Sequence, residues 1–254
     1  MTDLQHVESS DGTRIAYRAE GEGQPLVMVH GAATSSADWN FATPYLRERF
    51  TVVAMDRRGR GNSGDADDYA MEREADDVLA VLDATGAELL VGHSYGALCS
   101  MLAAERTARL RRLVLYEPPI AVREGTIGAV DELVAAGRLD TALEGFLRAA
   151  GTSDEQLALI RASPAWDVLL DAMPALPREL HACTAWRNPA GPIDTPTLFL
   201  LGAETRSSPY LDGLDELHAA FTDIRKELIP GQLHVGHVFA AEAFARLVSD
   251  FCSA

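Results

Sequence analysis

The chain has 254 residues, of which 47% are hydrophobic and 24% charged, a composition typical of a globular protein rather than a disordered one. Its 22 basic residues face 38 acidic ones, and the net charge of −16 disfavours nucleic acids and anionic membrane surfaces as main partners. Three scattered cysteines, Cys99, Cys183 and Cys252, are too few for a disulfide framework or a cysteine-rich metal site. No apolar run approaches about 18 residues, and the polar segment 1–12 lacks a signal-peptide pattern, so we expect a soluble cytoplasmic protein.

The chain begins with a predicted β-hairpin. Leu4–Glu8 and Thr13–Arg18 flank Asp11-Gly12, whose glycine readily adopts the positive φ of a tight turn. Short apolar strands then alternate with amphipathic helices, which predicts an α/β fold with a mostly parallel, doubly wound sheet covered on both faces. The remaining strands are expected at Pro25–His30, Thr51–Met55, Glu88–Gly92, Arg112–Tyr116, Thr197–Leu201 and Glu227–Ile229, with core helices at Ala75–Leu82, Tyr95–Ala104 and Phe244–Phe251.

One long stretch, 119–192, interrupts this alternation with helical patterns only. We therefore expect an α/β core made of residues 1–118 and 193–254, with a helical cap inserted at 119–192. Asp140 and Ser153 are the expected N-caps of two of the cap helices. The cap carries more large apolar side chains than short helices bury among themselves. We expect most of them to pack the cap onto the core and some to line a substrate cavity; they include Phe146, Trp166, Leu169, Leu170, Met173 and Trp186.

A strand–turn–helix junction carries the first chemical motif. Gly92-His93-Ser94-Tyr95-Gly96 matches G-x-S-x-G, the pattern of a nucleophile elbow. Glycine at both ends leaves room for a tight, strained turn between a closely packed strand and helix. Ser94 is then expected at the helix N-terminus, where partial positive charge favours an alkoxide. The motif predicts Ser94 as a nucleophile.

A serine hydroxyl needs a base that works near neutral pH, and histidine is the suitable side chain. His93 is adjacent to Ser94 but is expected to point away from it. His234 and His237 lie between the last predicted strand and the last helix, which gives the chain order serine, acid, histidine. The other four histidines are expected to be surface, packing or loop-ordering residues: His6, His30, His181 and His218.

Together these motifs resemble the α/β-hydrolase fold family, in its cap-bearing branch that acts on small molecules. His30-Gly31-Ala32-Ala33 resembles the family's oxyanion loop, and the segment 56–63 (DRRGRGNS) resembles its D-x-R-G-x-G-x-S loop. The resemblance implies an oxyanion hole made by the backbone N–H groups of Ala32 and Tyr95. We expect His30 to order its loop by hydrogen bonding, and 56–63 to be a solvated loop that braces the site.

The resemblance also separates the two candidate histidines. In this family the histidine precedes a phenylalanine by ten positions and a second apolar aromatic residue by seventeen. Counted from His234, these positions hold Phe244 and Phe251. Counted from His237, they hold Leu247 and Ala254, a poor match. The pattern therefore favours His234 as the base.

The acid departs from the commoner family pattern, which places Asp three residues after the glycine that ends the penultimate strand. That glycine is Gly202 here, and the third residue after it is Thr205. Glu204 is one candidate for the acid. Glu117 is the other, because it directly follows the strand 112–116, from which certain haloalkane dehalogenases in the family take their acid. Pro118 favours extended geometry at Glu117, so we predict Glu117 and keep Glu204 as the alternative.

These residues predict a serine hydrolase that cleaves a small ester, lactone or thioester through an acyl-enzyme. A serine nucleophile argues against the dehalogenase and epoxide hydrolase members, which use aspartate. The same residues also serve carbon–carbon hydrolases, cofactor-free perhydrolases and lyases or cyclases. A receptor-like binding protein with little catalysis is a further alternative. We find no metal or nucleotide motif, so no cofactor is expected; the expected partner is a small-molecule substrate, and the oligomeric state stays open.

Overall fold

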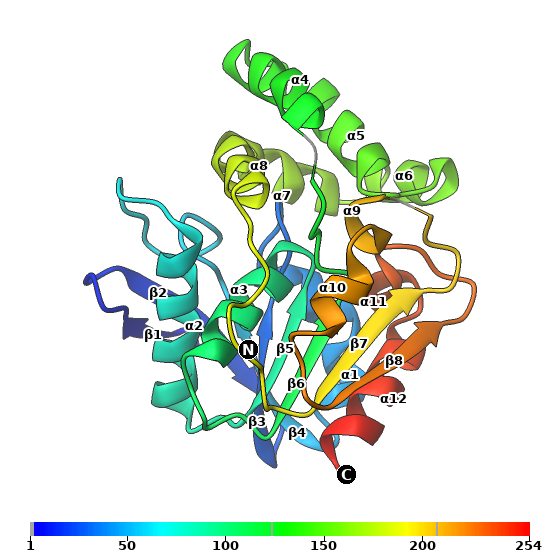
Figure 1. Cartoon of the computed structure of the whole chain (residues 1–254). Coiled ribbons are helices and arrows are strands. Elements are labelled where there is room, and N and C mark those ends of the chain that lie inside the picture. Colours follow the sequence, from blue (N-terminus) through cyan, green and yellow to red (C-terminus); the bar gives the residue numbers. More distant parts are fainter. Residues whose placement is uncertain (1–2, 123, 207) are drawn as a thin grey trace.

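An eight-stranded sheet organises the chain in the computed structural model, which describes residues 3–122, 124–206 and 208–254 (Figure 1). Neighbouring strands follow the order β1-β2-β4-β3-β5-β6-β7-β8. The strands are β1 (Gln5–Glu8), β2 (Arg14–Glu20), β3 (Gln24–Val29), β4 (Phe50–Met55), β5 (Leu89–His93), β6 (Arg112–Tyr116), β7 (Thr197–Gly202) and β8 (Ile224–Ile229).

The predicted hairpin and the mostly parallel sheet are both confirmed. β2 runs antiparallel to β1 and to β4, and Gly12 takes a φ of 84° in the hairpin turn. From β4 to β8 every neighbouring pair is parallel. Because parallel strands end at the same edge of a sheet, the residues that follow β3, β5, β6 and β7 meet along one edge.

Helices cover both faces of the sheet. Side chains alternate along a strand, so Val27 and Val29 of β3 pack on one face and Leu26 and Met28 on the other. This double burial accounts for the nearly continuous apolar runs in the sequence. The first face packs against α2 (Met71–Thr85), α3 (Tyr95–Glu105) and α10 (Leu214–His218), and the second against η1 (Ser36–Phe41), α1 (Thr43–Leu46) and α12 (Ala241–Cys252).

The helices between β6 and β7 gather above the sheet in Figure 1. They bury an apolar cluster of their own, which includes Leu143, Leu157, Trp166 and Met173 and also reaches Ala33 of the core. Trp186 packs instead in the cluster on the first face of the sheet. These helices are α4 (Glu124–Ala135), α5 (Leu139–Ala149), α6 (Asp154–Arg161), α7 (Ala165–Ala172), η2 (Met173–Ala175) and α8 (Leu176–Thr184).

The two expected N-caps differ in outcome. Ser153 caps α6 in a capping box, in which its hydroxyl accepts from the Gln156 N–H and the Gln156 side chain accepts from the Ser153 N–H. The expectation for Asp140 is wrong, because Arg138 occupies the N-cap of α5 and Asp140 lies in the first turn. There its carboxylate accepts from the indole N–H of Trp166, 3.0 Å away, and still lies near the positive end of the helix dipole.

Two short helices complete the edge at which the parallel strands end. α9 (Ser208–Leu211) follows β7, and α11 (Gly236–Phe239) follows β8. They carry Tyr210 and His237 into this edge. Within the described residues, no helix is long and apolar enough to cross a membrane.

Candidate active site

Strained backbone is concentrated at the edge where the parallel strands end. In the described residues, three non-glycine residues have positive φ: Ala33 (54°), Ser94 (52°) and Glu117 (46°). They lie in the loops that follow β3, β5 and β6. Such conformations cost about 1–3 kcal/mol each and persist where the surrounding structure holds them, commonly at functional sites.

Ser94 occupies the turn between β5 and α3, as the G-x-S-x-G pattern predicts. A Cβ atom on Gly92 would lie 2.5 Å from the Ser100 Oγ, and one on Gly96 would lie 2.4 Å from the carbonyl oxygens of Val29 and His30. Both glycines are therefore required for the close approach of α3 to the sheet. The Ser94 N–H donates to the Tyr116 carbonyl at 2.8 Å, which ties the turn to the end of β6.

Glu117 is fully buried, and its carboxylate accepts three hydrogen bonds. One oxygen lies 2.7 Å from the Nδ1 of His234. The other accepts from the Gly202 N–H at 2.7 Å and from the Thr205 hydroxyl at 2.6 Å. The structure thus places Thr205, which stands where the family more often has its acid, as a donor to Glu117. Glu204 is exposed and pairs with Arg206.

The expectation of an extended backbone at Glu117 is wrong. Its φ is 46°, in the left-handed region, although Pro118 follows it. Hydrogen bonds hold both the backbone and the side chain of Glu117 in this conformation. Its N–H donates to the Leu200 carbonyl at 3.1 Å, and its carboxylate bonds to Gly202 and His234.

The loop that carries His234 is held by β5 and β6. The Tyr116 hydroxyl donates to the Leu233 carbonyl at 2.5 Å and accepts from the Gly236 N–H at 2.8 Å. The Nε2 of His93 donates to the His234 carbonyl at 3.0 Å, so His93 serves this loop. Sequence reasoning missed Tyr116, whose only signal was a polar hydroxyl at the end of an apolar strand.

His237 is engaged away from Ser94. Its Nε2 lies 2.9 Å from a carboxylate oxygen of Asp38, and its ring packs 5.1 Å from that of Trp39. The ring is fully buried. His234, in contrast, lines a cavity together with Ser94.

Comparison with known proteins identifies the family. The model of the alpha/beta hydrolase family matches residues 26–249, a range that includes Ser94, Glu117 and His234. The chain belongs to the alpha/beta hydrolase family. Its sheet, with antiparallel strands at the N-terminal side and parallel strands elsewhere, has the fold of that family.

Several relatives of this chain have described activities or solved structures. A non-heme haloperoxidase of Rhodococcus erythropolis is 34% identical over 47% of this chain and 47% of its own length. A bifunctional esterase/perhydrolase of Acinetobacter calcoaceticus is 40% identical over 37% of this chain and 36% of its own. The matches thus span about half or less of these curated relatives. An alpha/beta hydrolase structure from Sphaerobacter thermophilus, 32% identical, superposes with a TM-score of 0.83 over 98% of this chain and all of the other.

Two cavities of the chain meet at Ser94. The first, which we call the α4 lobe, measures about 420 Å³ and lies among α4, α5, α8 and Tyr210. The second, the α7 lobe, measures about 500 Å³ and lies among α5, α6, α7 and the His234 loop. Ala32, Ser94 and Phe146 line both lobes, Tyr95 lines only the first, and Leu169 only the second.

The expectation that 56–63 is a solvated loop is wrong. The side chains of Arg57 and Arg58 are buried. Carboxylates from distant segments make this possible, because Arg57 pairs with Glu74 and Glu179, and Arg58 pairs with Asp77 and Asp11. The loop also braces the site, since Arg57 Nη1 donates to the Gly31 carbonyl at 2.8 Å.

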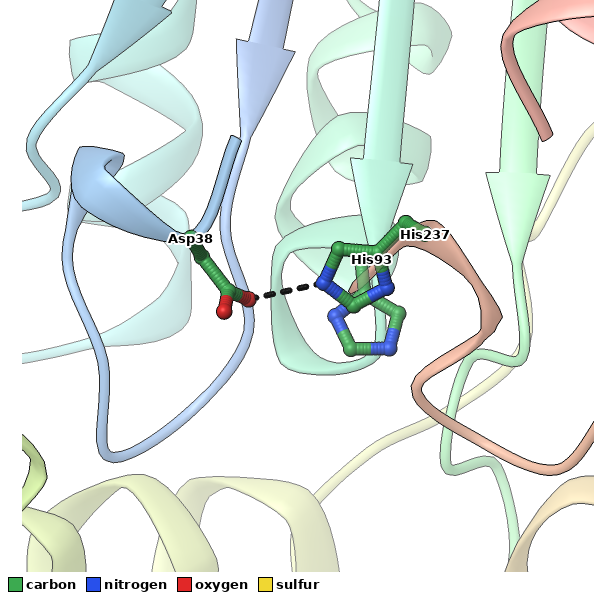
Figure 2. A group of neighbouring side chains, drawn as sticks. All are labelled: Asp38, His93 and His237. Atoms are coloured by element: carbon green, nitrogen blue, oxygen red, sulfur yellow. Dashed lines mark hydrogen bonds and ion pairs between the residues drawn. The ribbon is translucent and has the colours of Figure 1, made fainter. Parts of the chain in front are cut away.

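Three side chains form a cluster against the His234 loop, which His93 contacts through the His234 carbonyl (Figure 2). Asp38, His93 and His237 place one potential ligand atom each within 4.8 Å of one another, and no other such group occurs in the part of the chain that the structure describes. A structural zinc site takes four ligands. Hydrogen bonds to Asp38 and to the His234 carbonyl already engage the Nε2 atoms of His237 and His93. We therefore read the cluster as support for the loop.

His30 is a neutral buried histidine beside the loop that follows β3. Its Nε2 accepts the Arg57 N–H at 3.1 Å, so the hydrogen-bond network assigns the ring proton to Nδ1, which donates to the Gly31 carbonyl at 2.8 Å. Burial, and next the charge of Arg57, lower the pKa of His30 from 6.5 to about 4.

This lowered pKa predicts a loss of stability in mild acid. Between pH 6.5 and about 4 the unfolded chain gains a proton at His30 that the folded chain does not, so the free energy of unfolding falls by about 3 kcal/mol from this residue. Urea denaturation at pH 7.5, 5.5 and 4.5 measures the loss, and His30→Gln should show a shallower dependence. An NMR titration in which the His30 ring protonates near pH 6.5 in the folded wild type would contradict the prediction.

Proposed function

We propose that this hydrolase is a serine hydrolase that cleaves a small-molecule ester, lactone or thioester through Ser94, His234 and Glu117. The observation that carries the proposal is the 2.7 Å contact between the Glu117 carboxylate and His234 Nδ1. Ser94, in its strained turn, forms the other side of the site. Because Ser94 and His234 line one cavity, a bound carbonyl group can meet both.

In the proposed reaction His234 takes the Ser94 proton while the serine oxygen attacks the carbonyl carbon. Glu117 holds the proton on His234 Nδ1, leaves Nε2 as the basic nitrogen, and stabilises the imidazolium that forms. The protonated His234 then gives its proton to the leaving oxygen, and the acyl group stays on Ser94. Water, deprotonated by His234, releases the acid and restores Ser94.

The oxyanion of the tetrahedral intermediate is proposed to bind the backbone N–H groups of Ala32 and Tyr95. Tyr95 is the first residue of α3, where backbone N–H groups have no partner within the helix. Both residues line the α4 lobe beside Ser94. The helices α4–α8 are proposed to act as a cap over the core, because both lobes lie between them and the edge of the sheet.

Perhydrolysis is the second candidate function, and the relatives favour it. One is a bifunctional esterase/perhydrolase and another a non-heme haloperoxidase. In that reaction hydrogen peroxide replaces water in the second step, so the acyl-enzyme yields a peracid and free Ser94. The same residues would serve both reactions.

Loss of the nucleophile or base should abolish activity. Ser94→Ala and His234→Gln are expected to lower kcat/KM on p-nitrophenyl acetate by about 10³-fold or more, and Ser94→Ala should abolish labelling by a fluorophosphonate. His237→Gln is the matched control and should retain most of the activity, since His237 bonds to Asp38. An unlabelled wild-type chain would favour a binding protein, and loss of activity in His237→Gln alone would assign the base to His237.

The acid is tested by a pair of isosteric variants. Glu117→Gln keeps the shape of the buried side chain but cannot stabilise an imidazolium, so kcat should fall by about 10³-fold with little change in KM. Glu204→Gln alters an exposed carboxylate and should leave kcat within about twofold of wild type. Full activity in Glu117→Gln would remove this residue from the proposal.

A further inference from the structure

The two lobes bring different side chains to Ser94. His234, with Val235 and Val238 of its loop, lines the α7 lobe. Among the described residues that line the α4 lobe, His234 is absent, and Tyr210 is present. The Tyr210 ring stacks on the His234 ring with centroids 4.2 Å apart and an interplanar angle of 15°. Tyr210 therefore covers one face of His234 beside the α4 lobe.

This arrangement decides where the two halves of an ester lie. The proton on His234 must pass to the leaving oxygen, so the leaving alcohol has to lie on the side of the site that His234 lines. That side is the α7 lobe. The acyl group, which stays on Ser94, then extends into the α4 lobe.

The walls of the lobes indicate the chemistry of the two halves. The described side chains that line the α4 lobe carry no charge, and most are aliphatic, such as Val130, Leu133 and Leu180. The α7 lobe is lined by Leu159, Ile160, Val168 and Leu169, and Asp38 is also among its lining residues. An anionic alcohol group would be repelled by the Asp38 carboxylate, whereas aliphatic chains gain from burial in both lobes.

We propose that the substrate is a neutral ester with an aliphatic chain on each side, whose acyl chain occupies the α4 lobe and whose alcohol chain occupies the α7 lobe. This inference rests on the proposed function and adds the substrate class and its orientation.

Two small residues allow each lobe to be filled separately. Gly145 of α5 lines the α4 lobe, and a Cβ atom built on it meets no other atom within 4 Å. Ala165, the first residue of α7, is exposed and lines the α7 lobe. Gly145→Phe and Ala165→Phe thus place the same side chain in different lobes, at exposed positions.

The experiment uses two isomeric esters, ethyl octanoate and octyl acetate, with ethyl acetate as the short reference. Gly145→Phe should lower kcat/KM for ethyl octanoate by about tenfold or more and leave octyl acetate within about twofold of wild type. Ala165→Phe should do the reverse, so the ratio of kcat/KM for the two isomers should change in opposite directions in the two variants. Rates are followed by titration of the released acid.

The outcomes separate the inference from the function on which it rests. If Gly145→Phe slows octyl acetate and Ala165→Phe slows ethyl octanoate, the proposed orientation is wrong. If each variant slows both isomers equally, the assignment of separate lobes is wrong. If the wild type reacts with a fluorophosphonate at Ser94 yet hydrolyses neither isomer faster than ethyl acetate, the substrate class is wrong while the serine hydrolase stands. If Ser94 is not labelled, the proposed function itself fails.

A second inference comes from a different contact, between Arg57 and the oxyanion loop. The Gly31 carbonyl accepts two hydrogen bonds of 2.8 Å, from Arg57 Nη1 and from His30 Nδ1. The Gly31 carbonyl and the Ala32 N–H belong to one planar trans peptide and point in opposite directions. Donors that hold the carbonyl therefore also fix the direction of the Ala32 N–H.

The guanidinium of Arg57 is itself held by carboxylates from two parts of the fold. Glu74 of α2 binds it through two hydrogen bonds, 2.7 and 2.9 Å long. Glu179 of α8 also pairs with Arg57, and with Arg60 at 2.7 Å. All four side chains are buried. α8 is thereby connected, through Glu179 and Arg57, to the Gly31–Ala32 peptide.

We infer that Arg57 is a positioning residue for the oxyanion hole, which it couples to the docking of α8 through Glu179. This inference also rests on the proposed function. Arg58 offers a matched control, because it lies in the same loop, is equally buried and pairs with Asp77 and Asp11. No hydrogen bond from Arg58 to the oxyanion loop occurs in the described residues.

The test compares Arg57→Lys with Arg58→Lys. Lysine keeps the charge but loses the planar fork that binds two carboxylates and a carbonyl together. Arg57→Lys should lower kcat about tenfold to a hundredfold with little change in KM, and should weaken inhibition by a boronic acid, which forms a tetrahedral adduct with Ser94, by a similar factor. Arg58→Lys should lower the urea midpoint but leave kcat and boronate affinity within about threefold of wild type.

A purely structural role for Arg57 would give a different result. Both variants would then lose stability alike, and the folded fraction of Arg57→Lys would keep the kcat and boronate affinity of wild type. If Arg57→Lys does not fold, Glu74→Gln, which removes the charge of the other carboxylate bound to Arg57, should show the same loss of kcat and boronate affinity.

Discussion

The buried carboxylate of Glu117 is the group on which the geometry of this site depends. A charged group removed from water is costly unless hydrogen bonds replace its solvation. Here the replacements come from three segments: the imidazole of His234, the N–H that ends β7 and the hydroxyl of Thr205. Each of these donors lies at the edge of the sheet where the parallel strands end, so the sheet brings the three donors together. The carboxylate therefore links β6, β7 and the loop after β8.

The same geometry explains how an acid after β6 can stand in for one after β7. The two strands are neighbours, and Tyr116 pairs with Leu200 near their ends. A carboxylate after either strand can therefore approach the histidine loop. In this chain Thr205 occupies the position after β7 and donates to the carboxylate that arrives from β6. The threonine that interrupts the family pattern thus donates a hydrogen bond to the carboxylate that follows β6.

A second set of buried charges connects the helices above the sheet to the core. Arg57 and Arg60 from the loop after β4 meet Glu179 from α8, and Arg57 also meets Glu74 from α2. Buried ion pairs contribute little net stability compared with apolar packing, but they tolerate few alternative arrangements. In this fold they constrain the position of α8, and with it one wall of the α4 lobe. The shape of the proposed substrate site and the direction of the Gly31–Ala32 peptide then depend on the same contacts.

The sequence by itself determined the parts of this protein that follow from local rules. The hairpin, the parallel strands and the turn at Ser94 were predictable because side-chain periodicity, Asp-Gly and closely spaced glycines act over a few residues. Tertiary structure decided the rest. Which of Glu117 and Glu204 faces His234, and that His237 turns to Asp38, depend on side-chain directions that spacing does not encode. The burial of Arg57 and Arg58 was unpredictable from their own polar loop, since their partners lie in separate helices and the hairpin. The two lobes likewise exist only where helices from one part of the chain meet the strand ends of another.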